Sequence, residues 1–304
     1  MDAVVLHNIS KTYNKGSITA VTGVSLSVAK AELFGLIGPD GAGKTSIFRI
    51  LTTLLLPDGG SATVDGKDVV KDYKAIRGCV GYMPGKFSLY QDLTIEENIN
   101  FFATLFGTTL QENYDLVKDI YVQIEPFKNR RAGQLSGGMK QKLALCCALI
   151  HKPTVLFLDE PTTGVDAVSR KEFWEMLKRL KQQGITIMVS TPYMDEATLC
   201  DRIALIQSGK ILSVNTPASV VQAYPDKLYS IKGDTVSKML RDTRAYSNIL
   251  DVYAFGEYLH ATFKDGADNI TGITGYLKSK GHNNVEVTEA VPTIEDCFIR
   301  LLKQ

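Results

Sequence analysis

The stretch FGLIGPDGAGKTSIFRI, residues 34–50, joins a continuous apolar run to a glycine-rich turn and the start of a helical pattern. The apolar run predicts a buried central strand, because a strand covered on both faces lacks polar alternation. GPDGAGKT, residues 38–45, fits the pattern G-x-x-x-x-G-K-[ST]. Its position between a strand and a helix is the structural context in which this pattern binds phosphates.

The residue types of this turn indicate its chemistry. Glycines let backbone N–H groups wrap around phosphates, and the N-terminus of the following helix adds the positive end of its dipole. The Lys44 ammonium is expected to reach the β and γ phosphates, and the Thr45 hydroxyl to coordinate Mg²⁺. The sequence therefore predicts a site for a nucleoside triphosphate.

Two acids follow a second apolar strand in VLFLDE, residues 155–160. Asp159 is expected to reach the metal through water, and Glu160 to polarise an attacking water as general base. An apolar strand that ends in two acids is by itself also compatible with a simple strand cap. The presence of GPDGAGKT in the same chain favours the catalytic interpretation.

A third motif, LSGGMKQ at residues 135–141, stands at the head of a helical run. Ser136, Gly137 and Gly138 place a hydroxyl and exposed amides at a helix N-terminus, which predicts another anion site. A helix cap alone explains the serine. It does not explain two glycines, which cost helix stability unless a ligand must approach closely.

The rest of the sequence indicates which strands and helices surround these motifs. Strand-type runs at 3–9 and 18–28 and a hairpin at 57–69 come first, and a helical region at about 94–150 has breaks near Gly107 and Pro126. Strand and helix then alternate again, with a helix expected at about 167–182. A further helix with the acidic start Asp195-Glu196 is expected after ITIMVS, before a hairpin that turns at Ser208-Gly209. This alternation predicts a mostly parallel sheet covered by helices.

Composition narrows the class of protein. The 304 residues contain 34 Lys plus Arg against 33 Asp plus Glu, so no charge excess favours nucleic acid as a partner. Five cysteines without metal-type spacing suit a reducing cytosol. No apolar run reaches the roughly 18 to 20 residues that span a bilayer. The N-terminus has polar breaks too early for a signal peptide, so we expect a cytoplasmic chain.

GPDGAGKT, LSGGMKQ, VLFLDEP and TTGVDAVS, in this order, resemble the ATPase subunit of an ABC transporter over residues 3–215. The resemblance implies a P-loop NTPase core with an antiparallel β subdomain and a helical insert at about 88–145. On this basis residues 1–217 form the nucleotide-binding domain. After it, strand runs that include 249–255 and 258–263, with a helix near 269–280, predict a small α+β accessory domain at 218–304. The segment TIEDCFIRLL more loosely resembles the appendage of ATPases that drive export of drugs, lipids and polysaccharides.

The resemblance also implies roles for individual residues. Two such domains stack head to tail, and each ATP lies between one phosphate loop and the partner's LSGGM segment. Tyr13 would stack on adenine, Thr45 and Asp159 would surround Mg²⁺, and Asp166 would communicate across the dimer. Tyr13 also fits a surface tyrosine at a strand end, and Asp166 a helix N-cap. Ser136, Gly137 and Gly138 would close the partner's site. The phosphates would be held by Gly38, Pro39, Asp40, Gly41, Ala42, Gly43, Lys44, Thr45 and Ser46.

Two positions depart from the family pattern. After the strand CVGYM the family usually has Pro-Gln, whose glutamine reaches the metal and the attacking water, but this sequence has Pro84-Gly85. After ITIMVS the family usually has Thr-His, whose histidine bonds the γ-phosphate, but this sequence has Thr191-Pro192. Proline offers neither a side-chain donor nor a backbone N–H. We therefore expect a site that binds ATP and hydrolyses it poorly.

The sequence leaves several functions open. The first is an energy-coupling subunit of an exporter, peripheral on the inner face of the cell membrane and bound to permease subunits. Its intact LSGGM would complete an active site on a second ATPase domain or subunit. Lys86–Glu97, with Phe87, Leu89 and Tyr90, would contact the permease. The alternatives are a homodimeric active transport ATPase, a regulatory half that never turns over, and a soluble ABC ATPase outside transport.

Overall fold

The computed structural model describes residues 2–264 and 270–303, and it divides into two compact units. The first unit runs to Ser219 and also takes in the end of the chain from Leu301, and the second comprises Val220–Arg300. The short helix α7 (Pro217–Gln222) contains the boundary. In the described part of the chain, no helix is both long and apolar enough to cross a bilayer.

A six-stranded sheet forms the centre of the first unit, in the order β10-β9-β3-β8-β7-β6. All neighbours are parallel except β10 and β9, which form the hairpin predicted around Ser208-Gly209. β3, β7 and β8 are buried along their whole length, as their continuous apolar character predicts. The strands are β3 (Leu33–Ile37), β6 (Val80–Met83), β7 (Val155–Asp159), β8 (Thr186–Thr191), β9 (Arg202–Gln207) and β10 (Lys210–Asn215).

A second, antiparallel sheet has the order β2-β1-β4-β5. Its strands are β1 (Asp2–Tyr13), β2 (Ile18–Ala29), β4 (Gly59–Val64) and β5 (Lys67–Asp68). The predicted hairpin turns at Asp65-Gly66, where both residues have positive φ, the conformation of a two-residue hairpin turn. α1 (Lys44–Leu51) shares one apolar core with this sheet and with β3 and β7, so the phosphate loop is supported from both sheets.

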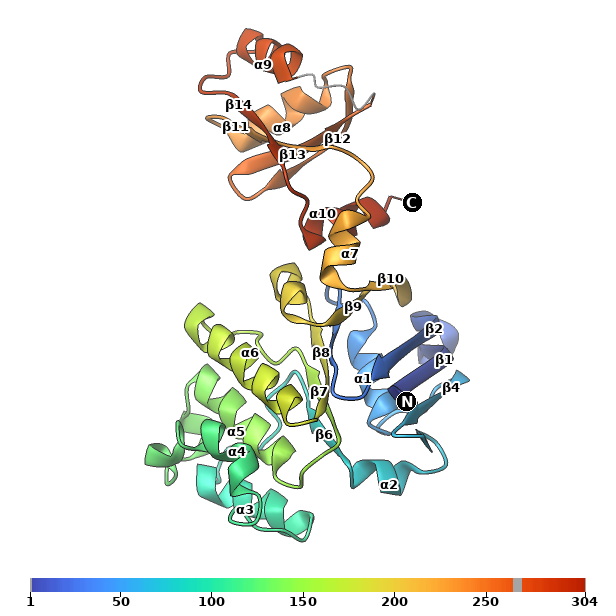
Figure 1. The fold of residues 1–304 in the computed structure, drawn as a ribbon, viewed down its shortest axis with the longest axis vertical. Helices are drawn as coiled ribbons and strands as arrows, with labels where there is room; N and C mark the ends of the chain where they lie inside the picture. Colours follow the sequence, from blue (N-terminus) through green and yellow to red (C-terminus); the bar gives the residue numbers. More distant parts are fainter. Residues whose placement is uncertain (1, 265–269, 304) are drawn as a thin grey trace. The chain divides into compact units, whose positions relative to one another are not determined.

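The helical insert gathers α3, α4 and α5 into one group (Figure 1). α3 (Ile95–Leu105) begins at a capping box, in which the Thr94 hydroxyl and the Glu97 carboxylate each accept the other residue's backbone N–H. The predicted break at Gly107 is a left-handed glycine with φ 68°, and the break at Pro126 lies in the short 3₁₀ helix η2 (Glu125–Phe127). The other helices of the unit are α2 (Tyr73–Arg77), α4 (Tyr114–Tyr121), α5 (Gly137–Leu149) and α6 (Ala167–Gln182).

The second unit has the element order β-α-β-β-α-β of a ferredoxin-like fold. Its antiparallel sheet, in the order β12-β13-β11-β14, shares an apolar core with α8 and α9. The helix predicted at 269–280 is α9, and Asn269 lies outside the described residues. The elements are β11 (Leu228–Lys232), α8 (Val236–Arg244), β12 (Ile249–Phe255), β13 (Tyr258–Phe263), α9 (Ile270–Ser279), β14 (Glu286–Ala290) and α10 (Ile294–Leu301).

Candidate nucleotide site

Four neighbouring parallel strands bring the sequence motifs to one edge of the central sheet. The phosphate loop follows β3, Asp159 ends β7, Thr191 ends β8, and Gly85 comes two residues after β6. In α/β sheets, ligands bind outside the carboxyl ends of the strands. The motifs that the sequence separates by more than a hundred residues therefore meet at the edge where such folds bind ligands.

The phosphate loop is shaped by glycines that tolerate no side chain. Gly43, the N-cap of α1, has φ 102°, and a Cβ there would lie 2.3 Å from the carbonyl oxygen of Ala20. A Cβ on Gly38 would lie 2.2 Å from the carbonyl oxygen of Ile206. The loop is therefore fixed between β2 and β9, which leaves its backbone in place for phosphates at the N-terminus of α1.

The Lys44 side chain is almost completely buried under this loop. Its ammonium donates hydrogen bonds to the carbonyl oxygens of Gly38 and Pro39, at 2.7 Å and 2.9 Å. The Glu160 carboxylate lies 3.1 Å from the same ammonium. Lys44 and Glu160 are thus brought together from two motifs that lie more than a hundred residues apart in the sequence.

Asp159 and Glu160 are both held by Ser190, which is completely buried at the end of β8. The Ser190 hydroxyl donates to Asp159 Oδ1 at 2.6 Å, and the Glu160 N–H donates to the Ser190 hydroxyl and carbonyl oxygens at 3.0 Å and 3.1 Å. Glu160 has φ 51°, a left-handed conformation that is uncommon outside glycine. The sequence did not indicate Ser190, because its place opposite Asp159 depends on the register of β7 and β8.

The residues present suit Mg²⁺ bound together with a nucleotide. Ser190 engages only Oδ1 of Asp159, so Oδ2 is available to a metal or its water. Burial and the negative charge of Asp159 raise the pKa of Tyr82 to about 12, so this neighbouring phenol stays neutral. Among the described residues no cluster of three or more His, Cys, Asp or Glu side chains offers a metal cage. One carboxylate, a hydroxyl and phosphate oxygens are the ligand set that Mg²⁺ commonly takes.

Tyr13 ends β1 beside the start of α1, and its hydroxyl lies 3.0 Å from the Ser46 hydroxyl. Tyr13 therefore lies near the phosphate loop, while its stacking on adenine stays a prediction. Asp166 is the N-cap of α6, and its carboxylate accepts the backbone N–H groups of Val168 and Ser169. The hydrogen bond from Ser169 lowers the pKa of Asp166. This cap explains Asp166 locally, and its expected role across a dimer stays a prediction.

The LSGGM segment caps α5 through the Ser136 hydroxyl, which accepts the N–H of Met139. Its glycines have close neighbours in the same chain. A Cβ on Gly137 would lie 3.3 Å from the carbonyl oxygen of Gly164, and a Cβ on Gly138 would lie 2.9 Å from the Ser169 hydroxyl. These glycines therefore do not by themselves require a ligand, because packing against the residues around Asp166 also accounts for them.

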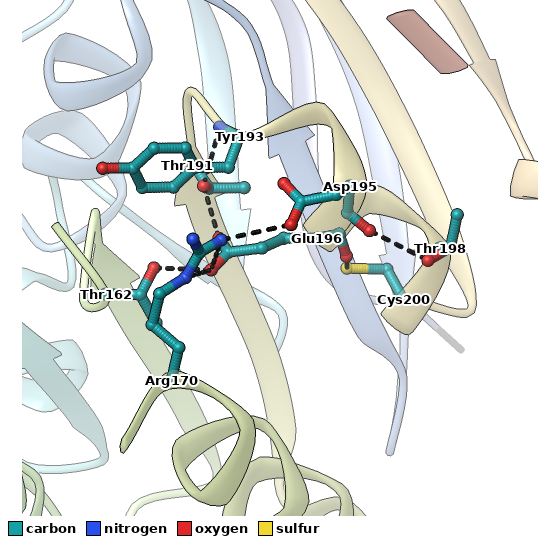
Figure 2. Close-up of polar contacts among 8 residues, drawn as sticks. All are labelled: Thr162, Arg170, Thr191, Tyr193, Asp195, Glu196, Thr198 and Cys200. Atoms are coloured by element: carbon teal, nitrogen blue, oxygen red, sulfur yellow. Dashed lines mark hydrogen bonds and ion pairs between the residues drawn. The ribbon is translucent and has the colours of Figure 1, made fainter. Parts of the chain in front are cut away.

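Gly85 and Pro192, the two departures from the family pattern, follow β6 and β8 on either side of β7, which ends at Asp159. A Cβ on Gly85 would lie 3.1 Å from the carbonyl oxygen of Asp159 and 3.8 Å from Glu160 Cβ, so a longer side chain here would start beside the acids. Pro192 directly follows β8. The helix expected after it is instead the 3₁₀ helix η4 (Met194–Leu199). Thr191 and Glu196 in this region form a buried network (Figure 2).

Three of the four histidines have partners away from the two departures from the family pattern. His151 bonds the carbonyl oxygen of Val80 at 3.0 Å, stacks on Phe106, and has its pKa lowered by burial. Val80 begins β6, at the opposite end of the strand from Gly85. His260 and His282 pair with Asp296 and Asp242 in the second unit. His151 is therefore a packing residue.

Comparisons with a family profile, with related sequences and with solved structures agree on one protein family. The profile of the family described as ABC transporter matches residues 6–163. The chain is 37% identical over 308 residues to the probable multidrug ABC transporter ATP-binding protein YbhF of Escherichia coli K12, which covers 99% of this chain and 52% of that protein. It thus spans about half the length of this relative. It is also 33% identical over 303 residues to the Nod factor export ATP-binding protein I of Rhizobium sp. N33, covering 98% of this chain and 96% of that protein.

Among solved structures, the chain resembles a dimeric bacterial ABC transporter cassette. The superposition has a TM-score of 0.64 at 26% identity and covers 70% of this chain and 98% of the cassette.

Proposed function

This chain belongs to the ABC transporter family of ATP-binding proteins, and on that premise we propose that it couples ATP to export as one half of an asymmetric ATPase pair. Residues 1–217 are the ATP-binding domain and 218–304 the accessory domain. This chain's own site binds Mg²⁺-ATP and hydrolyses it poorly. Its LSGGM segment completes an active site on a second domain or subunit. The names of the multidrug and Nod factor export relatives support the exporter class.

The observation that carries this proposal is the contrast within one site. The groups that bind phosphate and metal are assembled: Lys44 lies under the loop, and Ser190 orients Asp159. The two positions that would act on the attacking water and the γ-phosphate hold Gly85 and Pro192. Loss of one preorganised donor to developing charge lowers a rate by about 10²–10³. Binding depends less on such donors, because they act mainly in the transition state.

The permease partner is supported by an apolar cavity of about 470 Å³ in the first unit, with Leu89 and His151 among its lining residues. α3 contributes Phe102, α5 contributes Ala148, and Leu54 adds a side chain that is 57% exposed. A partly open cavity lined by apolar side chains suits an amphipathic helix from another protein. Of the three contacts expected from the sequence, only Leu89 lines it; Phe87 lies under Lys140 and Tyr90 packs on Phe101.

The proposal is tested by measuring ATP affinity and steady-state hydrolysis of the purified chain beside a Lys44→Ala variant. We expect ATP binding that the variant loses, with hydrolysis near the level of the variant. Robust hydrolysis that Lys44→Ala abolishes would contradict the asymmetric pair and favour the homodimeric active ATPase instead.

A further inference from the structure

A buried carboxylate lies directly beyond the Thr191-Pro192 turn. The side chain of Glu196, in η4, is 2% exposed and accepts hydrogen bonds from three segments of the chain (Figure 2). The Thr191 hydroxyl donates to Oε2 at 2.5 Å. The other oxygen, Oε1, accepts from the Thr162 hydroxyl at 2.8 Å and from Arg170 Nε and Nη2 at 3.1 Å and 2.9 Å.

The charge of Glu196 is compensated within this network. Arg170 pairs with it from the second turn of α6 and also lies 3.4 Å from Asp195. The ring of Tyr193 covers the guanidinium at 4.4 Å, which restricts Arg170 to this position. A buried carboxylate is costly unless it is paired and hydrogen-bonded, and both of its oxygens are satisfied here. Glu196 and the three side chains bonded to it, those of Thr162, Arg170 and Thr191, thus form one junction.

One side of the junction reaches the nucleotide site. The carbonyl oxygen of Thr191 accepts the N–H of Gly38, the first residue of the phosphate loop, at 3.2 Å. The preceding residue, Ser190, holds Asp159 and Glu160. Any movement of the phosphate loop against β8 therefore acts on Thr191, whose hydroxyl is bonded to Glu196.

The other side of the junction reaches the segment that leads to Asp166. The carbonyl oxygen of Thr162 accepts the N–H of Val165 at 3.2 Å, which forms the turn before the N-cap of α6. Thr162 is 1% exposed, so its bond to Glu196 is shielded from water. The segment Thr162–Asp166 is thus tied to Glu196 through Thr162 at its start and through Arg170 just after its end.

We propose that Glu196 and Arg170 are positioning residues that couple nucleotide in this phosphate loop to the segment Thr162–Asp166. The inference rests on the proposed ATP site. Pro192 offers no donor to a phosphate. The turn that carries it is held by the Thr191 hydroxyl, which donates to Glu196 and accepts the N–H of Tyr193. Nucleotide bound in the loop acts on the segment through Gly38, Thr191 and Glu196, without needing hydrolysis.

Hydrogen–deuterium exchange of the full chain, with and without Mg²⁺-ATP, tests this coupling. The two regions to compare are the phosphate loop at 38–47 and the segment at 162–168. In the wild type we expect ATP to slow exchange in both. In Glu196→Gln the loop should keep its ATP-dependent protection, while the ATP effect on 162–168 should fall about fivefold or more, the range of a typical coupling between sites. Arg170→Met should behave likewise, and Arg170→Lys should retain part of the effect.

Two further variants make the result decisive. Glu175→Gln breaks the exposed ion pair with Lys178 on the same helix, 3.1 Å long, and should leave both regions unchanged. Thr162→Val removes one hydroxyl at nearly constant side-chain volume. If Glu196→Gln does not fold, a partial loss of the ATP effect on exchange at 162–168 in Thr162→Val tests the coupling in its place.

Three results would overturn the inference. One is a wild-type ATP response at 162–168 in Glu196→Gln or Thr162→Val. Another is that exchange at 162–168 becomes faster in the variant by the same factor with and without ATP, which would indicate a merely structural role for Glu196. The third is a wild type in which ATP protects the loop but not 162–168. Absence of ATP protection at 38–47 in the wild type would instead refute ATP binding, and the coupling with it.

Discussion

Restoring the two missing side chains should raise the rate of ATP hydrolysis at this site. The variant is Gly85→Gln with Pro192→His. The backbone of Gly85 is not left-handed, so a side chain is allowed there. Its Cβ would stand 3.1 Å from the carbonyl oxygen of Asp159, which requires a shift of a few tenths of an ångström. From this position the glutamine amide starts beside Asp159 and Glu160.

The expected increase in kcat follows from the functional group that each substitution adds and from the strain or stability that it costs. A preorganised donor to developing charge contributes about 10²–10³ in rate. The shift at Gly85 moves the new amide off its best position, and loss of the proline constraint costs about 0.4–1 kcal/mol of stability. The two contributions act at one transition state and do not simply multiply. We therefore expect kcat to rise about 10- to 100-fold, with ATP affinity changed about threefold at most.

The assay is Mg²⁺-dependent phosphate release at saturating ATP. The matched control is Gly85→Ala with Pro192→Ala, which makes both backbone changes without adding either functional group. If the Gln/His variant folds, binds ATP and still hydrolyses no faster than the Ala/Ala control, Gly85 and Pro192 are not the cause of slow hydrolysis.

Two other predictions concern other parts of the chain. Leu54→Asp should abolish co-purification with a permease in detergent, because Leu54 lines the apolar cavity, whereas Leu56→Asp, 63% exposed and outside that lining, should not. Equal loss in both variants would remove the cavity as the docking site. Burial tends to raise the pKa of Asp296, but hydrogen bonds led by that from His260 outweigh it and lower the pKa to about 2. Since the unfolded pKa is near 3.8, about 2 kcal/mol of stability is present above about pH 4 and lost as pH falls towards 2. Urea unfolding of the full chain should show this loss, and Asp296→Asn should flatten it; an identical pH slope in the variant would contradict the assignment.

Local sequence patterns were sufficient for much of the fold. The helix expected at about 167–182 is α6, because an acidic N-cap and apolar residues at helical spacing mark both its start and its buried face. The strand runs at 249–255 and 258–263 are β12 and β13. α8 was not predicted, because its sequence VSKMLRDTR is mostly polar and only Met239 and Thr243 are buried.

Contacts between distant segments were beyond the sequence. Asp195 and Glu196 lie in the first turn of η4, as the acidic helix start predicts. The burial of Glu196 against Arg170, 26 positions earlier, has no signal in the local sequence. The glycines of LSGGM pack on residues around Asp166, which no local pattern indicates. Motif spacing predicted which residues meet at the phosphate loop, because parallel strands end at one edge. It could not predict Ser190 as their shared support, since that depends on the register of β7 and β8.

The most direct test of the central claim is a single-turnover measurement with γ-labelled ATP and excess protein. The account predicts that ATP bound by this chain, and not by Lys44→Ala, stays almost entirely uncleaved long after binding is complete. Prompt release of labelled phosphate from all bound ATP, abolished in Lys44→Ala, would contradict it and show that Gly85 and Pro192 leave the chemistry of this site intact.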